Sequence, residues 1–358
     1  MSFWLTVLII AHVIQTCFWL WIYNSLPSTS KRNHTSTRSL PGVSVVIAAK
    51  NEADNLTRHL PVILSQEYPN YEVIVIDDHS TDISLSVLID FAQKHRNLIF
   101  LPAEEFDGKK NALSIAITQA KHPWILCTDA DCIPNSKQWI KEMLAQHDSA
   151  DMILGYGPYH AKPTLLSAFV DYETWYIALQ YMTAALHNRA YMGVGRNLAF
   201  RKNLWEDVGG YKSHKTLCSG DDDLFVNAVA NKRILIETDS KSWTSSIPPS
   251  SVRELWEQKR RHLTTATSYS SKNKFFLALN FLSALIVYAL SAYLCYTASY
   301  CVLLLMLFRW FYQYFVSYRW MKKLGILRLW TVVPFLDFIL TLYYSIHGVI
   351  MLIPKKGW

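Results

Sequence analysis

Two aspartates separated by one residue, Asp129 and Asp131, directly follow an apolar run. Such a run predicts a buried strand, and a strand ending in two carboxylates can aim both at one divalent cation. Alone, this triplet is also typical of a solvated turn. Asp77 and Asp78 close an earlier apolar run, however, and residues 221–223 are three consecutive aspartates. In a chain of formal net charge +7, three such clusters indicate a site for a metal ion and the phosphates it carries.

The elements that must position these carboxylates are short β-branched runs alternating with helix-length segments. The expected strands cover residues 43–49, 71–78, 97–101, 124–129 and 152–156, and the expected helices lie near 54–66, 82–95, 109–121 and 136–147. This alternation predicts an α/β fold with a mostly parallel sheet and helices on both faces. Ligands of such sheets bind at the carboxyl ends of the strands, where the acidic pairs fall.

The sequence contains neither a GxGxxG nor a GxxxxGK[ST] motif, which disfavours a Rossmann dehydrogenase and a P-loop NTPase. Phosphate must then be held by a metal and by basic side chains. Lys109 and Lys110 enter the third expected helix and offer both cations and helix N-terminal amides. The plain alternative for the two lysines is a solvated helix start.

Apolar segments lie at both ends of the chain. Residues 3–23 carry no charge apart from the titratable His12 and are long enough to span a bilayer. The absence of a basic leader and of a small-residue cleavage site favours an anchor over a signal peptide. Residues 275–318 fit two further spans, and residues 329–353 fit one span or a bent, re-entrant pair.

The basic residues near these segments predict sidedness. Lys31, Arg32 and Arg38 follow the first span, which places the N-terminus outside and the next domain in the cytoplasm. Lys355 and Lys356 favour a cytoplasmic C-terminus, which needs an even number of C-terminal crossings, whereas about three apolar segments are expected. The sequence leaves this conflict open.

The basic excess lies largely beside apolar segments, where it is typical of topology signals and lipid contacts, and no nucleic-acid motif is present. We therefore expect no nucleic-acid partner. The six cysteines form no CxxC pair, and we interpret them as reduced and structural.

Several motifs, taken in order, resemble those of the inverting family 2 glycosyltransferases, which have the GT-A fold. The resemblance covers residues 42 to about 265 and is to membrane-anchored members of the ceramide-glucosyltransferase-like and cellulose-synthase-like kind. The motifs are Lys50-Asn51-Glu52, Asp77-Asp78, Gly108-Lys109, Asp129-Ala130-Asp131, the GDDDL run from Gly220, and Gln258 to Arg261.

The resemblance implies a role for each matching residue. The donor, a UDP- or GDP-sugar, would be bound by Ala49, Glu52, Asp77, Asp78, Lys109, Asp129, Gln258 and Arg261. Asp131, with Asp129, would hold Mg²⁺ or Mn²⁺. Asp222 matches the aspartate of the family's Glu-Asp pair and would be the general base, with Asp221 in the glutamate position. The plain alternative for this acidic run is a helix N-terminus, where aspartate is favoured anyway.

Gln258, Arg261 and His262 are spaced to share one helix face. The family pattern is Gln-x-x-Arg-Trp, so His262 replaces the tryptophan that stacks on the acceptor sugar in polymer-making members. This departure weakens the case for a processive synthase. A basic amphipathic helix lying on the membrane is the alternative for this segment.

An aromatic-rich stretch, residues 164–192, is too polar to span and is expected to rest at the bilayer interface. With residues 250–272 it would form a collar for a lipid acceptor, to which Trp175, Arg196 and His262 would contribute. A buried core helix is the alternative for this stretch.

The expected organisation is an anchor at residues 1–24, a basic linker at 25–41, a cytoplasmic catalytic domain at 42–249, an interfacial helix at 250–273 and a membrane region at 274–353. We expect an integral membrane protein, of the bacterial inner membrane, that moves one sugar to a lipid or membrane-proximal acceptor. The alternatives are a processive exopolysaccharide synthase and an inactive scaffold of the same fold.

Overall fold

The computed structural model describes residues 3–25, 40–102, 108–214, 217 and 219–352. Most of the expected linker, and with it Lys31, Arg32 and Arg38, lies outside the described residues, as do Cys218, Lys355 and Lys356. The chain divides into a sheet unit, residues 28–161 and 184–268, and a helical unit, residues 1–27, 162–183 and 269–358. Residues 162–183 therefore group with the terminal helices, and residues 250–268 group with the sheet.

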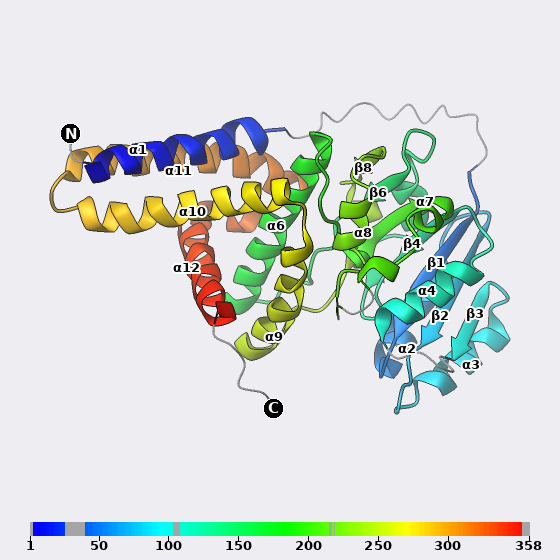
Figure 1. The fold of residues 1–358 in the computed structure, drawn as a ribbon. Coiled ribbons are helices and arrows are strands. Elements are labelled where there is room, and N and C mark those ends of the chain that lie inside the picture. Colours follow the sequence, from blue (N-terminus) through cyan, green and yellow to red (C-terminus); the bar gives the residue numbers. More distant parts are fainter. Residues whose placement is uncertain (1–2, 26–39, 103–107, 215–216, 218, 353–358) are drawn as a thin grey trace. The chain divides into compact units, whose positions relative to one another are not determined.

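The sheet unit is built on seven strands in the order β3-β2-β1-β4-β7-β6-β8 (Figure 1). They are β1 (Val43–Ala49), β2 (Tyr71–Asp77), β3 (Leu98–Pro102), β4 (Trp124–Cys127), β6 (Met152–Leu154), β7 (Leu198–Arg201) and β8 (Ile234–Ile236). A small second sheet pairs β5 (Ile133–Pro134) with β9 (Thr244–Ser245). All five expected strands are present, within a few residues of their expected ends.

Parallel pairing aligns the carboxyl ends of the central strands. β1 pairs in parallel with both β2 and β4, and in the first pair Ala49 lies opposite Asp77. β7 is antiparallel to its neighbours β4 and β6, so the sheet is mixed on this side. Because β7 runs the other way, the residues just before it lie at the same edge as the residues just after β4. Segments distant in sequence therefore converge at one edge.

Helices cover both faces of this sheet. The helices of the sheet unit are α2 (Ala53–Leu64), α3 (Ser84–Lys94), α4 (Lys109–Gln119), α5 (Trp139–Met143), α7 (Lys202–Asp207) and α8 (Asp223–Ala228), and the unit also contains α9 (Val252–Leu263), which lies away from the strands (Figure 1). Buried residues of α2, α3 and α5 form one core cluster with the alternate β1 residues Val43, Val45 and Ile47. α4 packs against β1 and β2 with a different buried set, as expected for the opposite face. The expected fourth helix, residues 136–147, is confined to α5.

Local capping explains where α9 begins. The Ser251 hydroxyl accepts a hydrogen bond from the amide of Glu254, three residues on, and the Glu254 carboxylate accepts one from the amide of Ser250. This Ser-x-x-Glu arrangement satisfies amides that a helix start leaves unpaired. Arg260, Arg261 and His262 form the basic last turn.

The helical unit contains α1 (Phe3–Thr16, continued by a π-helical turn, Cys17–Ile22), α6 (Leu165–Leu186), α10 (Ser271–Leu294), α11 (Ser299–Lys323), a 3₁₀ segment (Leu327–Val332) and α12 (Val333–Leu352). Four stretches within the described residues are long and apolar enough to cross a membrane: Phe3–Ile22, Ser271–Leu294, Tyr300–Lys323 and Leu327–Gly348. The expected N-terminal and C-terminal apolar segments are thus confirmed as helices.

Several polar side chains inside the helical unit are paired with one another. Arg309, which is fully buried, donates to Asp337 at 2.7 Å and to Gln15 at 2.9 Å, and Gln15 in turn donates to the Asn280 carbonyl. Such pairing is what makes a charge inside a membrane bundle tolerable. α6 also packs inward: Trp175 is fully buried against Tyr172 and Tyr176.

Candidate active site

The ends of β1 and β2 form one wall of the candidate site. The amide of Asp78 donates to the Ala49 carbonyl at 2.7 Å, and the Asp78 carboxylate accepts from the amide of Gly108 at 3.1 Å. Asp77 is buried, and its Oδ2 accepts from the amide of Ser80, while its Oδ1 is a buried oxygen with no hydrogen-bond partner in the described structure. A buried unpaired carboxylate oxygen is costly, so this atom is suited to receive a donor group from a ligand.

The loop after β1 is held in an uncommon backbone conformation. Asn51 has a φ of 57°, and after β2 His79 has a φ of 58°. The two loops are tied together because the Asn51 side chain accepts from the amide of Thr81 at 2.7 Å. Left-handed backbone at non-glycine residues persists where surrounding contacts enforce it and is frequent at functional sites.

Glu52 follows directly on this loop and accepts a hydrogen bond from Asn55 at 2.6 Å. Burial raises the pKa of Glu52, the Asn55 hydrogen bond opposes that rise, and the charges of Asp131 and Asp129 add to it. This coupling places Glu52 in the field of the Asp129-Ala130-Asp131 triplet.

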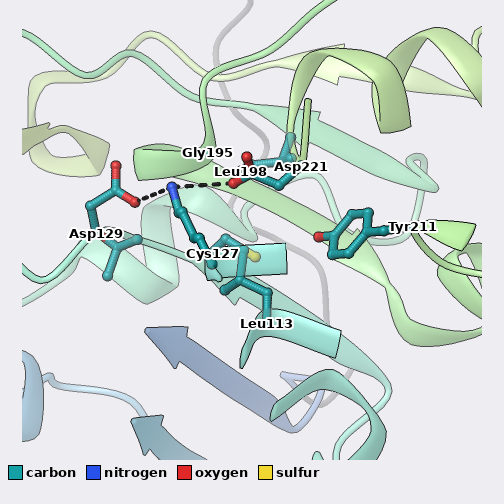
Figure 2. A pocket seen from close by; sticks show the side chains of 9 residues that line it. Leu113, Cys127, Asp129, Gly195, Leu198, Tyr211 and Asp221 are labelled. Carbon is teal, nitrogen blue, oxygen red and sulfur yellow. Dashed lines mark hydrogen bonds and ion pairs between the residues drawn. The ribbon is translucent and has the colours of Figure 1, made fainter. Parts of the chain in front are cut away.

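Lys109 connects the acidic cluster around Asp129 with the acidic cluster around Asp221. Its Nζ lies 2.7 Å from Asp129 Oδ1 and 3.2 Å from Asp221 Oδ2 (Figure 2). These three residues line one cavity together with Cys127, Gly195 and Tyr211 and others. The surrounding protein acts to lower the pKa of Lys109, but the two carboxylates outweigh it and raise the pKa well above its usual value. The lysine is therefore a fixed cation at the centre of the site.

Asp221 and Asp222 are adjacent, but their carboxylates differ in orientation and in pKa. Asp221 lines the cavity; burial acts to raise its pKa, and Lys109 more than offsets this, so the pKa is lowered. Asp222 accepts from the amide of Gly195 at 2.8 Å with Oδ2 and from the amide of Asp223 at 2.8 Å with Oδ1. Burial, with the charges of Asp221 and Asp223, raises the pKa of Asp222 to about 7.

One group of three neighbouring side chains in the site could hold a metal ion. Ligand atoms of Asp129, Asp131 and Cys132 all lie within 4.8 Å of one another. Asp131 is oriented by Ser246, whose hydroxyl donates to its Oδ2 at 2.6 Å. Burial and the charges of Asp131 and Asp129 raise the pKa of Cys132 well above its usual value, so this group stays a thiol at neutral pH. The two carboxylates are the ligands that suit Mg²⁺ or Mn²⁺.

A tyrosine without a sequence signal links the QxxR helix to the rest of the site. The Tyr159 hydroxyl accepts from Gln258 Nε2 at 3.1 Å, and the Arg196 guanidinium lies over the Tyr159 ring, 4.5 Å from its centroid. The backbone of residues 158–160 pairs with Ser246, the residue whose hydroxyl holds Asp131. Tyr159 thus connects α9 and Arg196 with the metal-binding group.

The remaining predicted residues fall into two places. Arg261 and His262 are exposed at the end of α9, and His262 lies in the field of Lys259, Arg261, Arg196 and Lys109. Surrounding protein and these positive charges lower the pKa of His262, so its imidazole is neutral at pH 7. Trp175 is buried in the helical unit, so its role on the acceptor side stays a prediction.

Sequence reasoning missed Tyr159, Ser246 and Tyr211. Tyr211 comes from a segment that follows β7, and Ser246 follows β9. Only long-range pairing brings these residues to the site, so no local spacing could have identified them.

Three comparisons place these findings among known proteins. Residues 44–209 match the family model described as glycosyl transferase family 2. The glycosyltransferase AglE of Haloferax volcanii is 30% identical over 189 residues, which cover 52% of this chain and 60% of that protein. Poly-beta-1,6-N-acetyl-D-glucosamine synthase of Staphylococcus epidermidis is 35% identical over 96 residues, which cover 27% and 23%.

The fold is also found in a solved structure. The mannosyltransferase PcManGT from Pyrobaculum calidifontis, in complex with GDP-Man and Mn²⁺, superposes with a TM-score of 0.59 at 18% identity, covering 92% of this chain and 98% of that one. At this identity the likeness establishes the GT-A fold. The chain spans less than two thirds of the length of the curated relatives it matches.

Proposed function

From the match of residues 44–209 to the family model of glycosyl transferase family 2, we propose that this chain is a membrane-bound glycosyltransferase. It transfers a sugar from a nucleotide-sugar to a lipid or membrane-proximal acceptor, with inversion at the anomeric carbon. The observation that carries the proposal is the cavity in which Lys109 lies between Asp129 and Asp221, beside the carboxylate pair of Asp129 and Asp131. Cations and metal-binding carboxylates at one sheet edge fit a diphosphate leaving group.

The donor would lie along the carboxyl ends of β1, β2 and β4. The Asp77 carboxylate, whose buried Oδ1 is unpaired in the described structure, would accept a hydrogen bond from the base or ribose, beside the turn from Ala49 to Glu52. Lys109 would contact the diphosphate, joined from α9 by Arg261, because guanidinium groups suit phosphate oxygens. The GDP-Man complex of the structural relative agrees with a nucleotide-sugar donor.

The carboxylates of Asp129 and Asp131 fit a divalent cation, since Ser246 orients Asp131 and the Cys132 thiol stays protonated. When bound there, Mg²⁺ or Mn²⁺ would neutralise charge on the leaving diphosphate.

Transfer requires one carboxylate to receive a proton. The acceptor hydroxyl oxygen bonds to the anomeric carbon, the bond from that carbon to the diphosphate breaks, and the hydroxyl proton passes to a base. We assign Asp222 as this base because its pKa of about 7 matches the operating pH. Asp221 is the competitor, because it lines the cavity while both Asp222 oxygens accept backbone hydrogen bonds.

The test is transfer by the purified full chain in lipid, with a panel of radiolabelled UDP- and GDP-sugars and Mn²⁺ or Mg²⁺, followed by lipid extraction. A single labelled sugar in the organic phase supports the proposal. A product of high molecular weight would instead indicate a processive synthase. The absence of turnover with every donor, in native lipid and with either metal, would favour an inactive scaffold.

A further inference from the structure

The last helix of the chain runs in a different direction from its apolar neighbours. In Figure 1, α1, α10 and α11 run side by side, whereas α12 crosses them at a steep angle within the same helical unit. α12 has the length and hydropathy of a membrane span. If the three side-by-side helices cross the bilayer, however, a helix at a steep angle to them lies along the membrane plane.

α12 packs beside α6, which is not among the candidate spans of the described residues. The Tyr344 hydroxyl donates to Glu173 at 2.7 Å, and the Tyr343 ring lies 5.2 Å from the Phe169 ring. Just before α12, Arg328 forms an ion pair with Asp171. Two of these contacts are made to buried carboxylates of α6. They hold α12 and α6 together as one pair of helices.

One face of α12 is apolar and exposed. Phe335, Phe338, Leu342 and Ile346 are all exposed, and their spacing of three, four and four residues puts them on one stripe. On the inward side, Asp337 is buried and accepts hydrogen bonds from Arg309 and from Tyr288, which anchors the start of α12 to the bundle interior. Because α12 packs on candidate membrane spans that also expose apolar side chains, such as Phe311 and Phe315 of α11, the partner of the stripe is the acyl-chain region of the same bilayer.

The charges identify which side of the membrane α12 borders. α1 leads into the sheet unit and α10 follows from it, so the end of α1 and the start of α10 lie on the catalytic side, and α11 returns to that side. Basic residues mark this side in the first turn of α10, the last turn of α11 and the segment before α12: Lys272, Lys274, Lys322, Lys323 and Arg328. The loop at the opposite side, residues 295–298, carries no charge.

We propose that the chain crosses the membrane three times and that α12 lies in the membrane plane, within the leaflet on the catalytic side. The N-terminus is then on the opposite side, and the C-terminus returns to the catalytic side. This arrangement puts Lys355 and Lys356 on the same side as the other basic residues, as the positive-inside rule requires, although four helices are apolar enough to span.

The depth of two α12 residues in the bilayer tests the proposal directly. Phe335 and Ile346 lie on the same stripe, eleven residues and about 16 Å apart along a helix axis. Each is replaced by cysteine, Phe335→Cys or Ile346→Cys, in a full chain whose Cys17, Cys218, Cys295 and Cys301 are serine and whose Cys127 and Cys132 are buried. The introduced cysteine is labelled with a fluorophore quenched by brominated lipids. We expect the two labels to report the same depth. A difference of about 16 Å would overturn the proposal.

Sidedness provides a second measurement that does not depend on the labelled variants. One epitope tag is placed after the C-terminus and another, in a separate full-length chain, is inserted after Thr297 in the loop between α10 and α11. In sealed vesicles of known orientation, the C-terminal tag should be accessible from the same side as the sheet unit, and the loop tag from the opposite side. Accessibility of both tags from one side would refute the three-crossing arrangement. Neither measurement requires transferase activity, so the outcome is independent of the proposed function.

Discussion

The pH dependence of transfer distinguishes Asp222 from Asp221 as the base. Burial and two neighbouring carboxylates raise the pKa of Asp222 to about 7, whereas Lys109 lowers the pKa of Asp221. A general base acts in its ionised form. If Asp222 is the base, kcat/KM rises with pH through about 7 and levels off above it, because kcat/KM reports the free enzyme.

The size of the effect follows from that pKa. One pH unit below it, about one eleventh of Asp222 is ionised, so transfer at pH 6 should be about tenfold slower than on the plateau. If Asp221 is the base, the group is already ionised at pH 6 and the profile stays flat there. The two assignments therefore differ by about one order of magnitude at one pH.

Two substitutions sharpen the distinction. Asp222→Asn should lower kcat by about 10²- to 10⁴-fold, the usual contribution of a general base, while nucleotide binding persists. Asp221→Asn removes one of the charges that raise the pKa of Asp222, so residual activity should show its acid limb at lower pH than the unmodified protein. Asp90→Asn, which makes the same charge change on the exposed face of α3, is the matched control.

The assay is initial-rate transfer over a pH series, with nucleoside diphosphate binding measured in parallel to separate catalysis from donor affinity. A flat profile down to pH 5 combined with loss of transfer in Asp221→Asn would show that Asp221 is the base. Near-normal transfer by Asp222→Asn would exclude Asp222 in any catalytic role.

Three further results are expected. Lys109→Met keeps the side-chain stem but removes the central cation, so nucleoside diphosphate affinity should fall at least about tenfold, with Lys141→Met as an exposed-lysine control and calorimetry as the measurement. Asp131→Asn should raise the Mn²⁺ concentration for half-maximal transfer by about tenfold or more, and an unchanged metal titration would contradict its role as a ligand. Tyr159→Phe removes one hydrogen bond to Gln258 but keeps the ring under Arg196, so kcat/KM should fall about fivefold, and adding Gln258→Leu should cost little more.

The strand-end carboxylates could be predicted from sequence because parallel strands share a carboxyl edge. β-branched runs predicted β1, β2 and β4, and their alignment places Asp77 and the residues after Cys127 at one edge. The periodicity requires no knowledge of distant residues. For the same reason, the apolar terminal segments were identified by length alone.

Features that depend on long-range pairing could not be predicted in this way. Strand β7 enters the sheet antiparallel between β4 and β6 and carries Gly195 to the site, and nothing in its local pattern indicates that direction. Tyr159 acquires its role only through partners 37 and 99 residues away, Arg196 and Gln258. Adjacent aspartates at a helix start also look equivalent in sequence. In the structure, however, Asp222 is the N-cap of α8 and its carboxylate accepts a hydrogen bond from the helix backbone, so its side chain is oriented differently from that of Asp221.

The aromatic-rich helix α6 shows a third limit. An aromatic helix of mixed polarity suits a membrane surface and a protein interior equally well, and composition does not choose between them. The buried ring of Trp175, packed on Tyr172 and Tyr176, favours the interior alternative for this part of the helix. The role of Trp175 toward an acceptor therefore remains a prediction.

The position of Lys109 makes the strength of the base depend on donor binding. The lysine is shared by Asp129 and Asp221, and a donor diphosphate competes with Asp221 for the same Nζ. As Lys109 turns toward phosphate, its positive charge offsets less of the negative charge of Asp221 and Asp222, so the pKa of Asp222 rises further. The acid limb of kcat, which reports the donor-bound enzyme, should therefore lie at higher pH than that of kcat/KM. Coincident limbs in the two profiles would show that Lys109 keeps its contact with Asp221 throughout transfer.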